Sequence, residues 1–252
     1  MTTKPHLRVE NLTMAYGETI IQERLDFSIN RGEIFIIMGG SGCGKSTLLR
    51  HLIGLMEPAA GKILFDEIDL WQTSDQERNR IISNFGVLFQ SGALWSSMTL
   101  GENIELVLKE HTDLTDRQIA EVVAYKLSLV GLSRFAEYYP SEISGGMRKR
   151  AGLARAMALD PDALFFDEPS AGLDPVSSRL LDDLILELRD SLGSTIVIVS
   201  HELASIFAVG DNSIFLDPTD KTIIARGAPQ MLLETSQDPR VISFLTRKAR
   251  LK

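Results

Sequence analysis

The stretch EIFIIMGGSGCGKSTLLRHLIGLM, residues 33–56, decides the fold of this chain. The apolar run at residues 33–39 predicts a buried strand, and residues 45–56 have the pattern of a helix. Between them, residues 39–47 fit the motif G-x-x-x-x-G-K-[ST], in the strand–loop–helix context that this motif requires. The alternative, a glycine-rich turn without a ligand, does not explain this context. We therefore expect a phosphate-binding loop and a bound nucleotide.

Each part of this loop has an expected partner on a nucleoside triphosphate. Backbone N–H groups cradle the α- and β-phosphates, Lys45 reaches the β- and γ-phosphates, and the Ser46 hydroxyl ligates Mg²⁺. We therefore expect a nucleotide and Mg²⁺ to contact Gly39, Gly40, Ser41, Gly42, Cys43, Gly44, Lys45, Ser46 and Thr47.

Four short apolar runs, each ending in polar residues, predict a mixed α/β fold with an open parallel sheet. Ligands of such sheets bind beyond the carboxyl ends of the strands. The runs are residues 33–39, 84–90, 162–168 and 194–201. Strand patterns are missing from residues 91–158, which we interpret as a helical lobe inserted into the sheet domain. Residues 228–248 predict two short helices, so 228–252 forms a C-terminal extension of a single domain spanning 1–252.

The motif ALFFDEP, residues 163–169, supplies a second part of a phosphate site. Asp167 follows a buried strand and is placed to bind Mg²⁺, and Glu168 is placed to take a proton from an attacking water. Alone, this pair is more often a strand end that runs into an exposed turn. Together with the phosphate loop, it indicates catalysis of phosphoryl transfer.

A second anion-binding pattern occurs in SEISGGMRKR, residues 141–150. Ser144, Gly145 and Gly146 open a basic helix, where exposed N–H groups and the helix dipole attract anions. Ser144 also fits a simple helix cap, but a cap does not explain two glycines. One chain with one nucleotide has no evident need for two such loops.

These motifs, in this order, resemble the ATP-binding cassette (ABC) ATPases over essentially the whole chain. The resemblance implies a P-loop NTPase with a RecA-like core sheet, an antiparallel β subdomain and an inserted helical subdomain. It also implies a homodimer in which the signature loop ISGGM, residues 143–147, closes over the ATP held by the partner subunit. The second anion site then serves the partner's nucleotide. Met147 departs from the usual Gln, which removes one polar contact but leaves the phosphate site unchanged.

The resemblance assigns four further residues. Tyr16 matches the aromatic that stacks on adenine, a contact worth roughly 1–3 kcal/mol, although an ordinary surface or core tyrosine is the alternative. Gln90 matches the glutamine that touches Mg²⁺ or water, His201 matches the histidine that senses the γ-phosphate, and Asp174 matches the loop that links the two sites. The expected catalytic set is Lys45, Gln90, Glu168 and His201.

The segments LFQSGALWSSMTLGENI, residues 88–104, and KEHTDL, residues 109–114, are similar to the ATPases of Mla/Mce lipid transport systems. This similarity implies phospholipid movement between bacterial envelope membranes, at the cytoplasmic side of the inner membrane. The implied partners are an MlaE-like permease dimer, an MCE-domain (MlaD-like) lipid-binding protein and often a STAS-domain (MlaB-like) protein. Leu94, Trp95 and Met98 either pack inside the lobe or dock on the permease.

Other function classes remain as alternatives. One is the motor of an importer for a polar solute, and another is a soluble ABC ATPase that acts on DNA or ribosomes. The latter usually carries a coiled-coil insertion or two cassettes, for which residues 91–143 leave no room. A P-loop kinase or GTPase does not explain the signature loop.

The composition agrees with a peripheral subunit. The net charge of −8 argues against general affinity for nucleic acid or anionic lipid, so we expect membrane contact through the permease alone. No apolar run approaches the ~20 residues that span a bilayer. The single cysteine, Cys43, excludes an internal disulfide and favours a reducing compartment. Its place near a helix N-terminus favours a thiolate, which nucleotide should protect from thiol reagents, and the alternative is a buried, inert thiol.

Overall fold

The computed structural model describes residues 5–247, and its centre is a six-stranded sheet. The strand order is β10-β9-β3-β8-β7-β6, with parallel pairing except between β10 and β9. The strands are β3 (Ile34–Gly39), β6 (Phe85–Leu88), β7 (Ala163–Asp167), β8 (Thr195–Val199), β9 (Asn212–Asp217) and β10 (Thr222–Arg226). Strands β3, β7 and β8 are almost wholly buried, as their continuous apolar runs predict. The expected α/β fold is confirmed.

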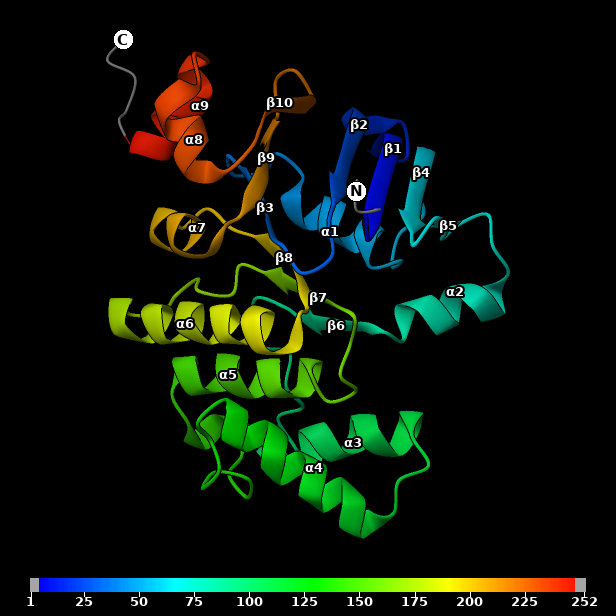
Figure 1. Cartoon of the computed structure of the whole chain (residues 1–252), viewed down its shortest axis with the longest axis vertical. Coiled ribbons are helices and arrows are strands. Elements are labelled where there is room, and N and C mark those ends of the chain that lie inside the picture. Colours follow the sequence, from blue (N-terminus) through cyan, green and yellow to red (C-terminus); the bar gives the residue numbers. More distant parts are fainter. Residues whose placement is uncertain (1–4, 248–252) are drawn as a thin grey trace.

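A second, four-stranded sheet stands beside the first, with antiparallel pairing in the order β2-β1-β4-β5 (Figure 1). Its strands are β1 (Leu7–Tyr16), β2 (Thr19–Ile29), β4 (Ala60–Phe65) and β5 (Ile68–Asp69). One face of this sheet packs with α1 (Lys45–Leu52) in a shared apolar cluster that includes Leu12, Met14 and Leu48. The antiparallel sheet expected from the family resemblance is therefore present.

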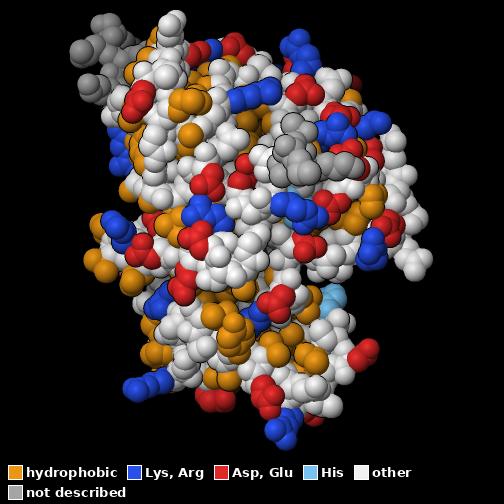
Figure 2. Space-filling model, viewed as in Figure 1, with side chains coloured by type: hydrophobic (Ala, Val, Ile, Leu, Met, Phe, Trp, Pro, Cys, Tyr) orange, Lys and Arg blue, Asp and Glu red, His pale blue; other side chains and the backbone are white. Residues whose placement is uncertain are grey.

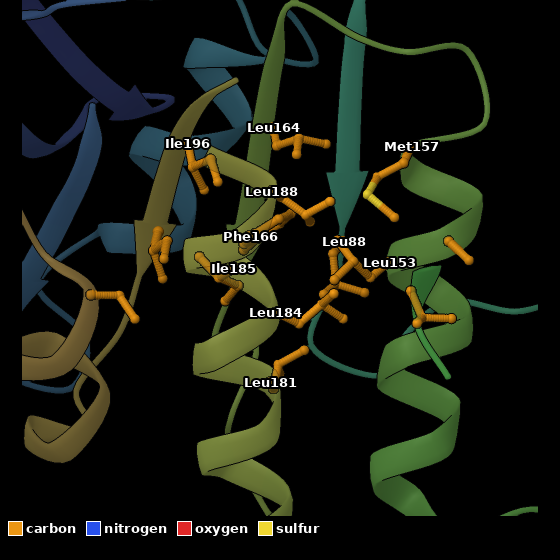
Figure 3. Packing of buried hydrophobic residues seen from close by; sticks show 14 of the residues in the cluster. Leu88, Leu153, Met157, Leu164, Phe166, Leu181, Leu184, Ile185, Leu188 and Ile196 are labelled. Atoms are coloured by element: carbon orange, nitrogen blue, oxygen red, sulfur yellow. The ribbon is translucent and has the colours of Figure 1, made fainter. Parts of the chain in front are cut away.

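The other face of the central sheet carries α5 (Gly145–Ala156) and α6 (Pro175–Leu192). Figure 3 shows Leu188 of α6 beside Phe166 of β7, and Leu184 near Leu153 of α5; Leu181 belongs to the same cluster. This spacing of three and four residues places the apolar side chains on one helix face. Because Ala and Gly residues dominate the buried side of α5, this helix lies close to its neighbours.

Residues 91–158 contain helices and no strand. Beyond α5, the helices α3 (Leu100–His111) and α4 (Asp116–Leu129) lie at the end of the molecule farthest from α9 (Figure 1). Both begin with a capping box, formed by Thr99 with Glu102 and by Thr115 with Gln118. The remaining helices are α2 (Asp75–Ile82), α7 (Leu203–Val209), α8 (Pro229–Thr235), α9 (Pro239–Thr246) and the 3₁₀ helix η1 (Pro140–Glu142).

The helix after the phosphate loop is shorter than the sequence pattern predicts. It ends at Leu52, because Gly54 adopts φ of +74° and its N–H turns back to the His51 carbonyl. The apolar residues that follow belong to a turn instead of a helix. Within residues 5–247, no helix is long and apolar enough to cross a bilayer.

Candidate nucleotide-binding and hydrolysis site

The phosphate loop lies between β3 and the N-terminus of α1, as its motif predicts. Gly44 caps α1 with φ of +95°, and a Cβ there would lie 2.7 Å from Ile21 Cγ2. At Gly39 a Cβ would lie 2.5 Å from the Leu216 carbonyl oxygen. Both positions therefore require glycine. The first turn of α1 carries no acidic residue, so its N–H groups and dipole favour an anion.

Lys45 is mostly buried and lies across this loop. Its Nζ donates to the carbonyl oxygens of Gly39 and Gly40, each at 3.0 Å. Lys45 thus lines a cleft of about 740 Å³, large enough for a nucleotide. The cleft is lined by Tyr16, Ile21, Gly39, Gly40, Ser41, Gly42, Gly44, Lys45, Ser46, Thr47, Gln90, Glu168, His201, Leu203, Phe244 and Arg247.

Ser46 and Asp167 meet beside this cleft. The Ser46 hydroxyl donates to Asp167 Oδ1 at 2.9 Å, joining α1 to the end of β7. Two hard oxygen donors suit Mg²⁺, which is usually bound by one or two carboxylates together with substrate phosphates and water. In the described residues, no group of three or more His, Cys, Asp or Glu side chains forms a complete metal cage. The donor set therefore fits a cation that arrives with the nucleotide.

Glu168 and His201 form the most tightly connected pair of the cleft. His201 Nδ1 lies 2.7 Å from Glu168 Oε1, and the His201 backbone N–H donates to Oε2 at 3.3 Å. In the ionised form of Glu168 the carboxylate can only accept, and His201 Nδ1 is then the donor of this contact. Glu168 itself is mostly buried and has φ of +49°, a conformation fixed in part by its N–H bond to the Val199 carbonyl. The carboxylate is thus held in a single orientation.

Tyr16 and Gln90 lie at the edge of the cleft. Tyr16 is 48 % exposed, and its hydroxyl lies 3.5 Å from Thr47 Oγ1. Its ring is therefore available to a ligand instead of being packed in the core. Gln90 is exposed just after β6 and also lines the cleft.

The signature loop and Asp174 lie together elsewhere. Ser144 caps α5 by accepting from the Met147 N–H at 3.2 Å, and a Cβ on Gly146 would lie 3.1 Å from Ser177. Asp174 caps α6 and accepts from Ser177. Within the described chain, the lining of the cleft includes neither the signature residues nor Asp174.

A comparison with known protein families identifies the family to which this arrangement of motifs belongs. The family described as ABC transporter matches residues 22–171, which include the phosphate loop, the signature loop and the Asp-Glu pair. The chain belongs to the ABC transporter family. Its members hydrolyse ATP, and this cassette is an ATPase.

Curated relatives match this cassette over nearly its full length. "Intermembrane phospholipid transport system ATP-binding protein MlaF" of Haemophilus influenzae is 41 % identical, covering 95 % of this chain and 89 % of the relative. The protein of that name in Escherichia coli K12 is 40 % identical, covering 94 % and 87 %. "Probable ribonucleotide transport ATP-binding protein mkl" of Mycobacterium tuberculosis is 43 % identical, covering 95 % of this chain and 66 % of the relative.

Solved structures agree with the ABC fold. The dimeric, post-hydrolysis cassette MJ0796 bound to ADP and Pi superposes with a TM-score of 0.79 at 29 % identity, covering 87 % of this chain and 97 % of that one. The protein cbiO1 of Clostridium perfringens, part of the transporter complex cbiONQ, gives a TM-score of 0.83 at 28 % identity, with 96 % coverage of both chains.

The cassette differs from the sequence-based expectation at Cys43. Its side chain is 1 % exposed and packs in the apolar cluster around α1, so it does not line the cleft. Burial raises the pKa of this thiol above its ordinary value, with Lys45 only partly opposing the effect. The expected thiolate is therefore wrong. Only the backbone of Cys43 remains available to phosphate.

Two lining residues of the cassette come from an element that the motifs do not cover. Phe244 lies on α9 and packs edge-on against Phe215 of β9, and Arg247 follows α9 and donates to Glu202 at 3.0 Å. Glu202 is the neighbour of His201 in sequence. No local signal marks Phe244 or Arg247, because both reach the cleft through tertiary packing.

The apolar residues after Gln90 have different environments. Leu94 is half-buried against the core cluster of the helical region, whereas Trp95 is 58 % exposed. The Trp95 backbone is fixed by Asn103, a fully buried amide on α3. Met98 is half-buried like Leu94, so Trp95 is the most exposed side chain of this group.

Proposed function

We propose that this cassette is the ATP-hydrolysing motor of a transporter that moves phospholipid between bacterial envelope membranes. The observation that carries the motor function is the meeting of Lys45, Gln90, Glu168 and His201 around one nucleotide-sized cleft. The phospholipid cargo is supported by the similarity to the two MlaF proteins along nearly the whole chain.

In this proposal each side chain has one task. The N–H groups of the loop and the Lys45 ammonium bind the phosphates of ATP and offset the charge that develops on the leaving group. Glu168 orients the attacking water and takes its proton. His201 fixes the Glu168 carboxylate through Nδ1, and its half-exposed ring lines the cleft with Nε2 lying 3.7 Å from Glu202 Oε1. Tyr16 stacks on the adenine.

Mg²⁺ would be held by Ser46 and Asp167, with Gln90 reaching it or the water, and would supply positive charge that neutralises the phosphates. The Ser46 hydroxyl and the Asp167 carboxylate are already in contact, so little rearrangement is needed.

The signature loop completes the site of a second subunit. Ser144 and Gly146 offer an anion site at the α5 N-terminus that lies outside the cleft of their own chain. In a head-to-tail homodimer each loop covers the γ-phosphate of the partner, with Asp174 beside it. The dimeric state of the MJ0796 cassette supports this arrangement.

The motor attaches to the membrane through partners. We propose that the region around Trp95 docks on an inner-membrane permease dimer, at the cytoplasmic side of the membrane. An MCE-domain protein and a STAS-domain protein are further proposed partners. On the face shown in Figure 2, acidic and basic side chains are interspersed instead of forming a basic stripe, which suits a protein partner better than nucleic acid or anionic lipid.

The second candidate is a motor for a polar solute, supported by the name of the mycobacterial relative. The cleft has the volume and the lysine that ATP requires, and in this proposal it binds ATP and not the cargo. The membrane partners would then select the cargo. The two candidates therefore differ only at the level of the whole complex.

A transfer assay on the complex distinguishes them. The tagged cassette is purified with its membrane partners, reconstituted in vesicles, and supplied with fluorescent phospholipid or labelled ribonucleotide. We expect ATP-dependent phospholipid transfer that the Glu168→Gln complex lacks. ATP-dependent movement of ribonucleotide without lipid transfer would reverse the cargo assignment.

A further inference from the structure

Helix α5, which begins at the signature loop, carries a lysine that points into the protein. Lys149 is 6 % exposed, and its Nζ donates to the backbone carbonyl oxygen of Glu168 at 3.1 Å. The bond joins the signature helix to the residue that we propose as the catalytic base of the same chain. The motif analysis did not identify this link.

The environment of Lys149 is costly for a charge. Burial lowers the pKa of the ammonium, while the negative charges of Glu168 and Asp167 oppose this effect. Within residues 5–247 no carboxylate oxygen lies within 4.0 Å of the Lys149 Nζ. The ammonium is therefore stabilised by a hydrogen bond to a neutral carbonyl and by the more distant negative charges of Glu168 and Asp167. A buried lysine usually forms an ion pair with a carboxylate. Lys126 is such a case, since it is 2 % exposed and forms an ion pair with Asp160 at 2.5 Å.

The same helix also contacts the loop that follows Gln90. Arg155 donates to the Ala93 carbonyl at 2.6 Å, and Gly152 lies so close to Gly92 that a Cβ would come within 2.9 Å of its carbonyl oxygen. Helix α5 thus connects three places: the signature loop at its N-terminus, Glu168 through Lys149, and the loop after Gln90 through its last turns.

We propose that Lys149 is a positioning residue that couples the signature loop of a subunit to the Glu168 carboxylate of that same subunit. The ammonium holds the Glu168 backbone in its positive-φ conformation, so a displacement of α5 moves the carboxylate. A nucleotide of the partner, bound at Ser144, thereby adjusts the base that acts on the subunit's own ATP. The inference rests on the proposed role of Glu168.

The test compares Lys149→Met with Lys149→Arg and with Lys126→Met, a matched removal of a buried ammonium away from the cleft. Because a displacement of about 1 Å can cost ~100-fold, we expect Lys149→Met to lower kcat by about tenfold to 100-fold. KM for ATP should stay within about twofold, since the bond is made to Glu168 and not to the phosphate loop. Lys149→Arg should restore most of kcat, and Lys126→Met should leave kcat unchanged. Circular dichroism and nucleotide binding confirm that each variant is folded.

A double-mutant cycle separates this inference from the role of Glu168. Lys149→Met should add no further loss to Glu168→Gln, because its effect is exerted through that carboxylate. Full kcat in Lys149→Met alongside an inactive Glu168→Gln would overturn the coupling and leave the proposed base intact. Normal kcat in Glu168→Gln would overturn both. Equal losses in Lys149→Met and Lys126→Met would reduce Lys149 to a packing role and refute the proposal.

Discussion

The phosphate loop and the signature loop have similar local chemistry, but only the phosphate loop is surrounded by the other residues of a nucleotide site. Both place glycines and a hydroxyl-bearing residue at the N-terminus of a helix, α1 in one case and α5 in the other. Around the first loop the same chain gathers a lysine, two carboxylates, a histidine and an aromatic ring. Ser144 is exposed and lies outside that cleft. A helix N-terminus alone therefore does not make a nucleotide site. The side chains around it decide whether one chain forms the whole site or supplies only part of it.

The largest expected effect comes from a substitution in the phosphate loop. Lys45→Ala removes the ammonium that lies across Gly39 and Gly40, so ATP hydrolysis should fall by at least about 100-fold. Phosphate release and binding of a fluorescent ATP analogue measure the loss. Lys62→Ala, at an exposed position of β4, is the control and should behave like the wild type. Activity retained by Lys45→Ala would contradict the assignment of the cleft.

The next effect tests whether the second loop is half of a shared site. In a covalently linked dimer, Lys45→Ala on one subunit and Ser144→Arg on the other should leave one intact site, formed by the unchanged loop of each chain. The same two substitutions on a single subunit should damage both sites. We expect about half of the wild-type turnover in the first arrangement and less than about a tenth in the second, by the loss of a phosphate contact.

Steady-state hydrolysis by the two linked dimers supplies the comparison. Higher activity when both substitutions share one subunit would mean that each signature loop serves the nucleotide of its own chain, and equal activity would mean that the signature loop does not contribute to hydrolysis. The proposed head-to-tail dimer would then be wrong.

A smaller effect concerns the turn that joins Glu168 to Asp174, the segment between the two regions. Asp182 of α6 is buried and accepts from Ser205, which in turn contacts Ser170 of this turn. Burial raises the pKa of the Asp182 carboxyl to about 6. A carboxyl with a raised pKa favours the folded state at low pH, and this contribution is lost as pH rises through about 6.

Asp182→Asn should therefore stabilise the protein at pH 7.5, by at most about 3 kcal/mol, and raise Tm by about 5 °C. The gain should shrink as the pH falls from about 6 and be mostly lost near pH 4, because Asp182 is then protonated in the folded chain and close to its ordinary pKa of 3.8 in the unfolded chain. Thermal unfolding at the two pH values measures it, with Asp183→Asn at the exposed neighbouring position as the control. A Tm gain that is the same at both pH values would have another cause.

The smallest effect concerns Cys43. Because this thiol is buried and its pKa is raised, a maleimide should label it at least about tenfold more slowly than Cys at an exposed site such as Leu55→Cys. Bound ATP should slow the labelling further by stabilising the loop. Rapid labelling that ignores Mg-ATP would contradict the burial of the thiol in the apolar cluster around α1.

The residue patterns predict the parallel sheet, the helices of residues 91–158 and the phosphate loop with Asp167 and Glu168, because each motif joins a local backbone shape to a chemical group. The antiparallel sheet and the places of Tyr16, Gln90 and His201 are expected only from the family resemblance.

Several features escape such reasoning. The thiolate expected at Cys43 is wrong, since packing against α1 outweighs proximity to the helix N-terminus. Phe244 reaches the cleft because α9 folds back on β9, and Lys149 points inward because α5 lies against β6 and α6. These placements depend on contacts between distant segments, which no local pattern encodes.

The basic residues of α5 differ in one respect from those that hold α9. Arg148, Lys149, Arg150 and Arg155 all donate to backbone carbonyls, whereas Arg240 of α9 bonds Asp217, Asp220 and Asp238, and Arg247 bonds Glu202. Attraction between ions at the surface is screened by dissolved salt, but a hydrogen bond to a neutral carbonyl is hardly affected. Raising the ionic strength should therefore loosen α9 from the edge of the cleft while α5 keeps its place. The polar contacts of α9 should thus respond to the salt content of the surroundings, whereas those of α5 should not.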